Sequence, residues 1–245
     1  GLQGYPSAAE ESIIARDIAI ADQTGSHLHI GHISTAGGVE LVRNARARGV
    51  HVTAEVTPHH LTMTEDWILG EKGEGSSFEI LTSNAYETRA KVSPPLRTAY
   101  DREMLILGLK DGTIDAIATD HAPHTFGDKA VPFDQASVGI SVLETAFGSL
   151  MTLVDAGLID LPLLLHRLTA GPSSILGEKY KAIANLKIGS FADLVLIDIN
   201  EKWTVDTKNF QSKGKNTPLE FSELRGKVKL TIADGQIAFE DVSRA

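Results

Sequence analysis

The most informative group of residues that could do chemistry lies between Asp115 and His124, in the sequence DAIATDHAPH. An apolar run leads directly into a carboxylate, Asp120, which is followed by His121 and His124. The run predicts a buried parallel strand that ends at Asp120. Because the catalytic groups of α/β barrels lie at the C-terminal ends of their strands, this segment suggests a barrel and a reaction centre together.

Composition limits the classes of protein to consider. The chain has 245 residues, of which 42% are hydrophobic, enough for one large domain or one domain with an appendage. Its net charge is −9 and it has no Lys/Arg cluster, so we expect no nucleic-acid surface. We also expect neither a membrane span nor a signal peptide. The absence of cysteine leaves His, Asp and Glu as metal ligands and fits a reducing cytoplasm, where we expect the protein to be located.

Alternating strands and helices position the catalytic segment. The predicted strands are 28–33, 50–56 and 114–119. The predicted helices are 7–24, from Ser34 or Thr35 to Gly49, 101–110, 142–156 and 162–168, followed by a turn near 173–176. Ile13, Ile14, Ile18 and Ile20 are expected on the apolar side of the first helix. Residues 67–85 are rich in Gly and Ser, which favours a long mobile loop, and the two prolines of KVSPPLR make residues 91–97 extended.

The pattern changes towards the C-terminus. The segments DLVLIDI, KVKLTIADG and QIAFED are rich in strand-forming residues and have hairpin-like turns, so we predict a small β-sandwich-like unit at 185–245. Residues 1–184 alternate between strand and helix, but they contain only three or four of the eight strands that a closed barrel needs. The first helix also has no strand before it. The predicted fold is therefore α/β, a partial TIM-like (β/α) barrel that holds the last strands, plus the β-unit.

Three segments, HISTAGGVELVRNARARGVHVTAEVTPHHL, KVSPPLR and GTIDAIATDHAPH, resemble dihydroorotases of the bacterial class I type, within the cyclic amidohydrolases of the amidohydrolase superfamily. The similarity covers essentially the whole chain, including its FADLVLID and NTP segments. It implies a metal-dependent hydrolase barrel that interconverts N-carbamoyl-L-aspartate and (S)-dihydroorotate in de novo pyrimidine biosynthesis. It also implies a binuclear centre whose HxH pair, bridging Asp or carbamylated Lys, and further His lie on earlier strands that this sequence does not contain. Ligands of this kind, without sulfur, favour Zn²⁺.

Two residues of this sequence match metal ligands of that family. His32 would by itself be read as a hydrogen-bonded core histidine, and Asp120 as a helix cap. The resemblance instead makes both of them metal ligands and makes Asp120 the proton shuttle. We therefore expect His32 and Asp120 to converge at one mouth of a parallel sheet. His121 is expected to support Asp120 or its loop.

Four residues match positions that contact the substrate in the family. His124 matches the residue that helps to hold the substrate carboxylate. Val138 and Gly139 match a loop whose backbone binds the ring, although the loop reads ASVG here where the family often has Pro-Phe-Gly. Ser93 stands where many members have Asn; a serine keeps a hydroxyl but loses reach and the amide pair.

The other histidines of interest are predicted to have different roles. His27 and His29 form an HxH pair, but at the beginning of a strand, which is the wrong end of a barrel for metal binding. His59 and His60 are predicted to make structural hydrogen bonds, because adjacent side chains on an extended strand point in opposite directions. Glu55 lies in a strand that looks buried and would need a partner that the sequence does not name.

Three functions agree with these observations. The first is dihydroorotase, of which this chain is a fragment. The second is a hydantoinase- or allantoinase-type cyclic amidohydrolase that acts on another ring, and the third is a non-catalytic dihydroorotase-like assembly partner. The expected partners are a small-molecule substrate and either a second copy of the protein or other enzymes of the pyrimidine pathway, with no nucleic acid and no membrane.

Overall fold

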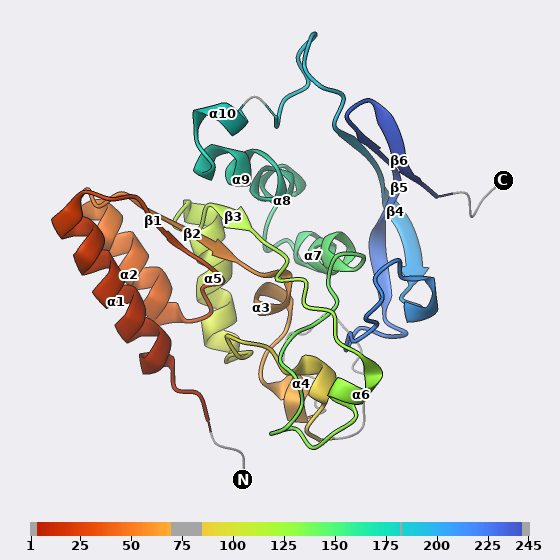
Figure 1. Cartoon of the computed structure of the whole chain (residues 1–245), viewed down its shortest axis with the longest axis horizontal. Helices are drawn as coiled ribbons and strands as arrows, with labels where there is room; N and C mark the ends of the chain where they lie inside the picture. The colour runs from red at the N-terminus through yellow and green to blue at the C-terminus, as the bar shows by residue number, and fades with distance from the viewer. Residues whose placement is uncertain (1–3, 70–84, 182, 242–245) are drawn as a thin grey trace.

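The computed structural model in Figure 1 describes residues 4–69, 85–181 and 183–241. Most of the loop predicted at 67–85 falls on residues 70–84, outside these ranges. The chain forms a parallel sheet with helices packed on it and a second, antiparallel sheet at the opposite end of the molecule (Figure 1). None of the helices in the described ranges is long and apolar enough to cross a membrane.

The first sheet consists of β1 (Leu28–Ile30), β2 (Val52–Val56) and β3 (Ala116–Ile117), in the order β1-β2-β3. Both pairs are parallel, which confirms the predicted direction of all three strands. The strands are shorter than predicted, most of all β3. Single hydrogen bonds continue the pairing at both ends of β3, from Asp115 N to Ala54 O and from Ala118 N to Val56 O. This three-stranded sheet does not close into a barrel within the described ranges, so the partial barrel stays a prediction.

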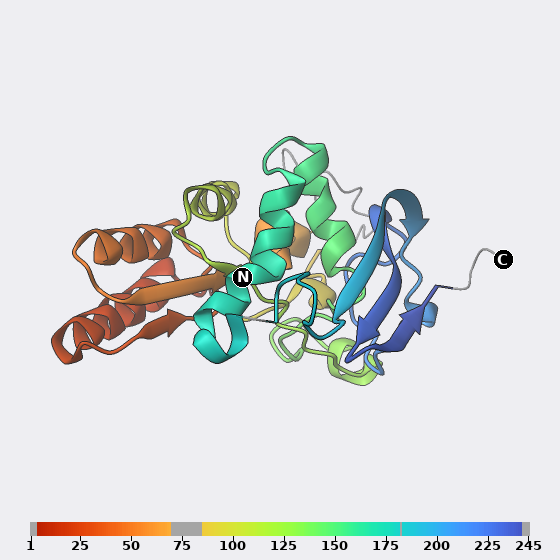
Figure 2. The same cartoon turned by 90° about the horizontal axis from the view of Figure 1, so that it is seen from above.

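Helices cover the parallel sheet. The helices of the described ranges are α1 (Ser7–Thr24), α2 (Ala36–Ala47), α3 (Pro58–Thr62), α4 (Asp66–Leu69), α5 (Ala99–Asp111), α6 (Phe126–Lys129), α7 (Ala146–Asp155), α8 (Leu161–Leu168), α9 (Ala170–Ile175) and α10 (Glu178–Lys181), with 3-10 turns η1 (Thr88–Ala90) and η2 (Thr207–Asn209). Helices α1 and α2 lie side by side against β1 and β2 (Figures 1 and 2). Their apolar residues join those of β2 and α5 in one core, in which Val39, Val42 and Ala54 are completely buried.

The first helix follows its prediction in length but not in its buried face. Gly25 ends it in the left-handed conformation with φ 68°, which a glycine adopts without strain. Ile14, Ile18 and Ala21 face the core, whereas Ile13 and Ile20, which we expected on the apolar side, are about half exposed. The 3.6-residue period explains the difference, because positions 14, 18 and 21 share one face of a helix.

The segment TPHH is helical, which corrects the prediction that His59 and His60 lie on extended chain. Thr57 caps α3 by accepting a hydrogen bond from His60 N, and Pro58 occupies the first turn. Proline fits there because it has no N–H and its fixed φ suits a helix start. The two histidines therefore lie on one turn of a short buried helix.

The second sheet contains β4 (Leu194–Thr204), β5 (Glu223–Ala233) and β6 (Gln236–Glu240), all antiparallel. Asp234 and Gly235 connect β5 to β6, both with positive φ, as a two-residue hairpin turn requires. Helix α7 packs against β5 between the two sheets. A second core joins Met63, Trp67 and Ile140 to residues from 203 to 224, so the β-unit shares its core with the preceding part. Its sandwich-like character stays a prediction.

Candidate active site

His32 and Asp120 meet beyond the C-terminal ends of strands β1 and β3. His32 Nε2 lies 3.8 Å from Asp120 Oδ1, and both side chains are largely but not completely buried. This confirms the prediction that the two residues converge, although they come from opposite edges of the sheet. An imidazole nitrogen and a carboxylate oxygen at this spacing could face one shared cation.

Both residues also have unusual backbone conformations. His32 has φ 53° and Asp120 has φ 47°, in the left-handed region that few residues other than glycine adopt. Elsewhere in the described ranges the only other non-glycine residues with positive φ are Tyr86, Phe221 and Asp234. Strained conformations persist where the surrounding structure imposes them, and they concentrate at functional sites. Their coincidence at two neighbouring strand ends supports a functional role for this pair.

The partner that Glu55 needs is a pair of histidines. On β2, Glu55 Oε1 lies 3.0 Å from His32 Nδ1, and Oε2 lies 3.3 Å from His29 Nε2. The first contact has the distance of an ion pair, but the direction of the His32 N–H is not that of a good hydrogen bond. Burial opposes ionisation of Glu55, yet the two histidines outweigh it and lower its pKa to about 2.

The same contacts act on the other members of the cluster. The Glu55 carboxylate raises the pKa of His32 against the opposing effect of burial, and the charge of Asp120 adds to it. Burial raises the pKa of Asp120, assisted by the charge of Glu55 and opposed by His32. Because Glu55 occupies the Nδ1 side of His32, the imidazole presents Nε2 to Asp120. A carboxylate behind a histidine is a common way to orient a metal ligand.

The HxH pair does not face this cluster as a pair. His27 Nε2 and His29 Nδ1 both contact the hydroxyl of Thr53, at 2.8 and 2.9 Å. Only His29 also reaches Glu55. The interpretation of the pair as unrelated to a metal stays a prediction. His29 lies in the middle of β1, not at its beginning, and holds Glu55, a role that the sequence did not indicate.

His121 supports the loop that follows β3. Its Nδ1 accepts hydrogen bonds from Val142 N (3.0 Å) and Leu143 N (3.2 Å), so the ring proton is on Nε2, which faces Ser212 Oγ at 3.3 Å. We expected His121 to support either Asp120 or its loop, and these hydrogen bonds support the loop.

The structure brings three of the four expected substrate residues together. His124 Nε2 donates to Val138 O at 2.8 Å, and Gly139 follows directly. Gly139 has φ 137°, and a Cβ at this position would lie only 2.5 Å from that of Ala122, so only glycine fits. The N–H of Gly139 donates to Lys91 O, so in this structure it is already used within the protein.

Ser93 lies apart from that group and close to His32. The two residues line a cavity of about 260 Å³, together with His29, Glu10 and Tyr5. The peptide bond between Ser93 and Pro94 is cis. Asp120 and the three loop residues are not among the residues that line this cavity, so the expected substrate residues form two separate groups.

Asn216 is a site-building residue that the sequence did not single out, although it begins the NTP segment. It is buried; its Oδ1 accepts from His124 N (2.7 Å) and from Ser141 Oγ (3.0 Å). Its Nδ2 donates to Gly139 O at 3.0 Å and, more weakly, to Ala122 O at 3.4 Å. One side chain thus ties the loop of His124 to the loop of Gly139.

The adjacent histidines of α3 differ from each other. His60 makes the structural hydrogen bonds that we predicted: Nδ1 meets the hydroxyl of Thr57 at 2.7 Å, and Nε2 donates to Pro94 O at 3.0 Å. The prediction is wrong for His59, whose two ring nitrogens are buried without a hydrogen-bond partner among the described residues. Burial lowers the pKa of both rings, to about 4 for His60.

Comparison with known proteins places this geometry in a family. The sequence model of the amidohydrolase family matches residues 7–238. The chain belongs to the amidohydrolase family. Among curated members of similar sequence are the dihydroorotase of Caldanaerobacter subterraneus subsp. tengcongensis, 49% identical, and that of Syntrophus aciditrophicus, 42% identical. Each match covers 98% of this chain and 52% of the relative, so the chain spans about half the length of these relatives.

Solved structures of the amidohydrolase fold are also similar. The L-hydantoinase (dihydropyrimidinase) of Arthrobacter aurescens has a TM-score of 0.82 and is 28% identical, over 96% of this chain and 49% of its own. The D-hydantoinase of Bacillus sp. AR9 has a TM-score of 0.83 at 25% identity, over 96% of this chain and 50% of its own. The fold is thus that of half of an amidohydrolase.

Proposed function

We propose that this chain is part of a dihydroorotase, to which it contributes the proton shuttle, one further metal ligand and part of the substrate site. The observation that carries the proposal is the meeting of His32 and Asp120, 3.8 Å apart at two strand ends. The similarity to dihydroorotases at 42–49% identity over 98% of the chain supports this substrate above others. The hydantoinase structures have lower identity, 28% and 25% in the two cases above.

The chemistry of the donors fits a metal ion. A neutral imidazole nitrogen and a carboxylate oxygen are both ligands that Zn²⁺ accepts, and Glu55 stands behind His32 as an orienting carboxylate. Within the part of the chain that the structure describes, no group of three or more His, Cys, Asp or Glu could hold a metal ion. We therefore infer that His32 and Asp120 complete a site whose other ligands lie elsewhere in the full protein. When bound, the metal supplies Lewis acidity, which polarises the amide carbonyl and makes water more acidic.

Asp120 has the central role in the proposed reaction. In the hydrolytic direction water adds to the ring amide carbonyl of dihydroorotate, and Asp120 accepts the proton that the water loses. The carboxyl group then donates this proton to the ring nitrogen as the C–N bond breaks, so that the carboxylate is restored. Its position beside His32 and its partial burial suit a group that exchanges a proton within a closed site.

The loop residues position the substrate. His124 uses Nε2 to donate to Val138 O, so its Nδ1 edge is the one left to face the substrate carboxylate. Ser93 lines the same cavity as His32 and offers a hydroxyl to the substrate. The reverse reaction, ring closure with release of water, uses the same groups in the opposite order.

The test is a substrate panel with the complete polypeptide that includes this chain. Dihydroorotate, hydantoin, dihydrouracil and allantoin are offered to the metal-loaded protein and to its Asp120→Asn variant. We expect hydrolysis of dihydroorotate alone, abolished by the substitution. Preference for hydantoin or allantoin would favour the second hypothesis, and inactivity on all four with a correctly folded, metal-loaded protein would favour the assembly partner.

A further inference from the structure

The only lysine ammonium that is almost completely buried among the described residues belongs to Lys129, the last residue of α6. The residue is 5% exposed, and its Nζ donates to three backbone carbonyls: Ser137 O at 2.6 Å, Thr88 O at 3.0 Å and Lys91 O at 3.3 Å. Three carbonyl acceptors match the three N–H donors of an ammonium group. The side chain is thus placed where it can satisfy every donor without water.

This environment is costly for a charge. No carboxylate forms an ion pair with Lys129 within the described ranges, and burial together with the charge of Lys91 lowers its pKa to about 8, against a smaller opposing effect of Glu87. Burying an ammonium without a paired carboxylate costs free energy of desolvation, which hydrogen bonds to the three carbonyls offset. These bonds also indicate which segments the side chain holds in place.

The three carbonyls belong to two segments that the sequence does not connect closely. Thr88 begins η1 and Lys91 follows it, whereas Ser137 directly precedes Val138 and Gly139. Gly139 N also donates to Lys91 O, at 2.8 Å, and Thr88 Oγ1 donates to Lys129 O, at 2.7 Å. The ammonium therefore connects the loop before Gly139 to η1 and the residue that follows it.

We propose that Lys129 is a positioning residue that fixes the Val138–Gly139 segment, and through it the His124 imidazole, for binding of the substrate. The connection is short: Nζ holds Ser137 O, the next residue is Val138, and Val138 O holds His124 Nε2. Lys129 touches no reacting group; it acts through these carbonyls. This inference rests on the proposed function for the substrate, but the restraint on the loop can be measured without it.

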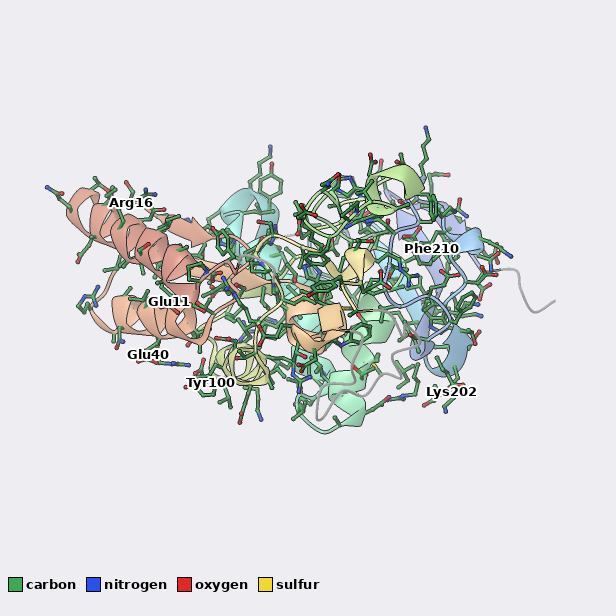
Figure 3. The ribbon with its side chains drawn as sticks, turned by 90° about the horizontal axis from the view of Figure 1, so that it is seen from below. Glu11, Arg16, Glu40, Tyr100, Lys202 and Phe210 are labelled. Atoms are coloured by element: carbon green, nitrogen blue, oxygen red, sulfur yellow. The ribbon has the colours of Figure 1, made fainter. Side chains whose placement is uncertain are left out.

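The test uses Lys129→Met in the complete polypeptide, because methionine is similar in length and has no donor. Lys202→Met is the matched control, since Lys202 is an exposed lysine of the β-unit, paired with Glu223 (Figure 3). Two quantities are measured: amide hydrogen exchange of the peptide that contains 136–140, and the kcat and KM of dihydroorotate hydrolysis. We expect faster exchange and a KM raised roughly tenfold, with kcat changed by less than about threefold and metal content unchanged. Lys202→Met should match the wild type in all of them.

Lys129→Arg keeps the charge and N–H donors, so its KM should lie between those of Lys129→Met and the wild type. A general loss of packing would not explain such a partial recovery. If Lys129→Met does not fold, Lys129→Gln, which keeps two N–H donors, is measured in the same way. Unchanged exchange at 136–140 would overturn the proposal, and so would faster exchange with an unchanged KM. An inactive but folded wild-type protein would instead refute the proposed function and with it the substrate role of Lys129, while exchange would still decide whether the loop is restrained.

Discussion

His60 offers a sharp test of the buried architecture beside the site. In the folded protein Nε2 of the ring donates to Pro94 O, and Nδ1 accepts from the hydroxyl of Thr57, which itself caps α3. Burial lowers the pKa of His60 from 6.5 to about 4. Between these two values the unfolded chain binds a proton that the folded chain does not. The free energy of unfolding must therefore fall as the pH is lowered through this window.

The size of the effect follows from the shift. A difference of about 2.5 pKa units lowers the free energy of unfolding by roughly 3 kcal/mol. This loss of stability is absent above pH 7 and fully developed near pH 4. The variant His60→Gln has an amide that can replace part of both hydrogen bonds but cannot titrate. At pH 7 we expect it to be less stable than the wild type by about 1 kcal/mol, the usual net value of one hydrogen bond. At pH 4 the order should be reversed, because the variant avoids the penalty.

Urea unfolding at several pH values between 7 and 4 measures this, with the fluorescence of the two tryptophans as the signal. The carboxylates and His59 titrate in both proteins, so the informative quantity is the difference between wild type and variant at each pH. A difference that does not change with pH would show that His60 is not held neutral by burial and would refute the reasoning.

Three further outcomes follow from the site. Replacing Asp120 with Asn keeps the shape of the side chain but removes the base, so the rate of dihydroorotate hydrolysis should fall about 10²–10⁴-fold. The circular dichroism spectrum should stay unchanged, and near-normal turnover would contradict the shuttle role. His124→Ala should raise KM and leave the metal content intact, and loss of metal on elemental analysis would argue for a ligand instead. Glu55→Gln should weaken metal binding roughly 10–100-fold in competition with a chelator, whereas Glu40→Gln on the outer face of α2 (Figure 3) should not; equal affinities would show that Glu55 does not orient His32.

The strands could be predicted because their signals are local: an apolar run that ends in a polar residue marks the C-terminal end of a parallel strand. The choice of His32 and Asp120 as a pair came from the resemblance to dihydroorotases, and the structure brings the two together. The helix at TPHH was not predicted, although its signals, a capping threonine and a proline in the first turn, are also local. The period of the first helix was assigned too loosely, since Ile13 and Ile20 face outwards.

Contacts between distant segments could not be predicted in this way. The partners of Glu55 depend on the register of β1 against β2, which pairs His29 with Thr53 and so puts His29 on the same face as Glu55. Asn216 is far along the chain from His124 and Gly139, and nothing in its neighbours indicates which loops it will join. Such residues are found only when the hydrogen bonds of each buried polar group are followed to their partners.

The two halves of the site are held by different means, so substitutions in each half should have different effects. His32 and Asp120 are placed by strained backbone at strand ends and by the Glu55 carboxylate, so damage there should appear first in metal affinity. His124 and Gly139 are placed by side chains, Asn216 and Lys129, that bond to loop backbone. Damage to these bonds should appear in KM while the metal stays bound, because in the described part of the chain the hydrogen bonds of Asn216 and Lys129 involve neither His32 nor Asp120.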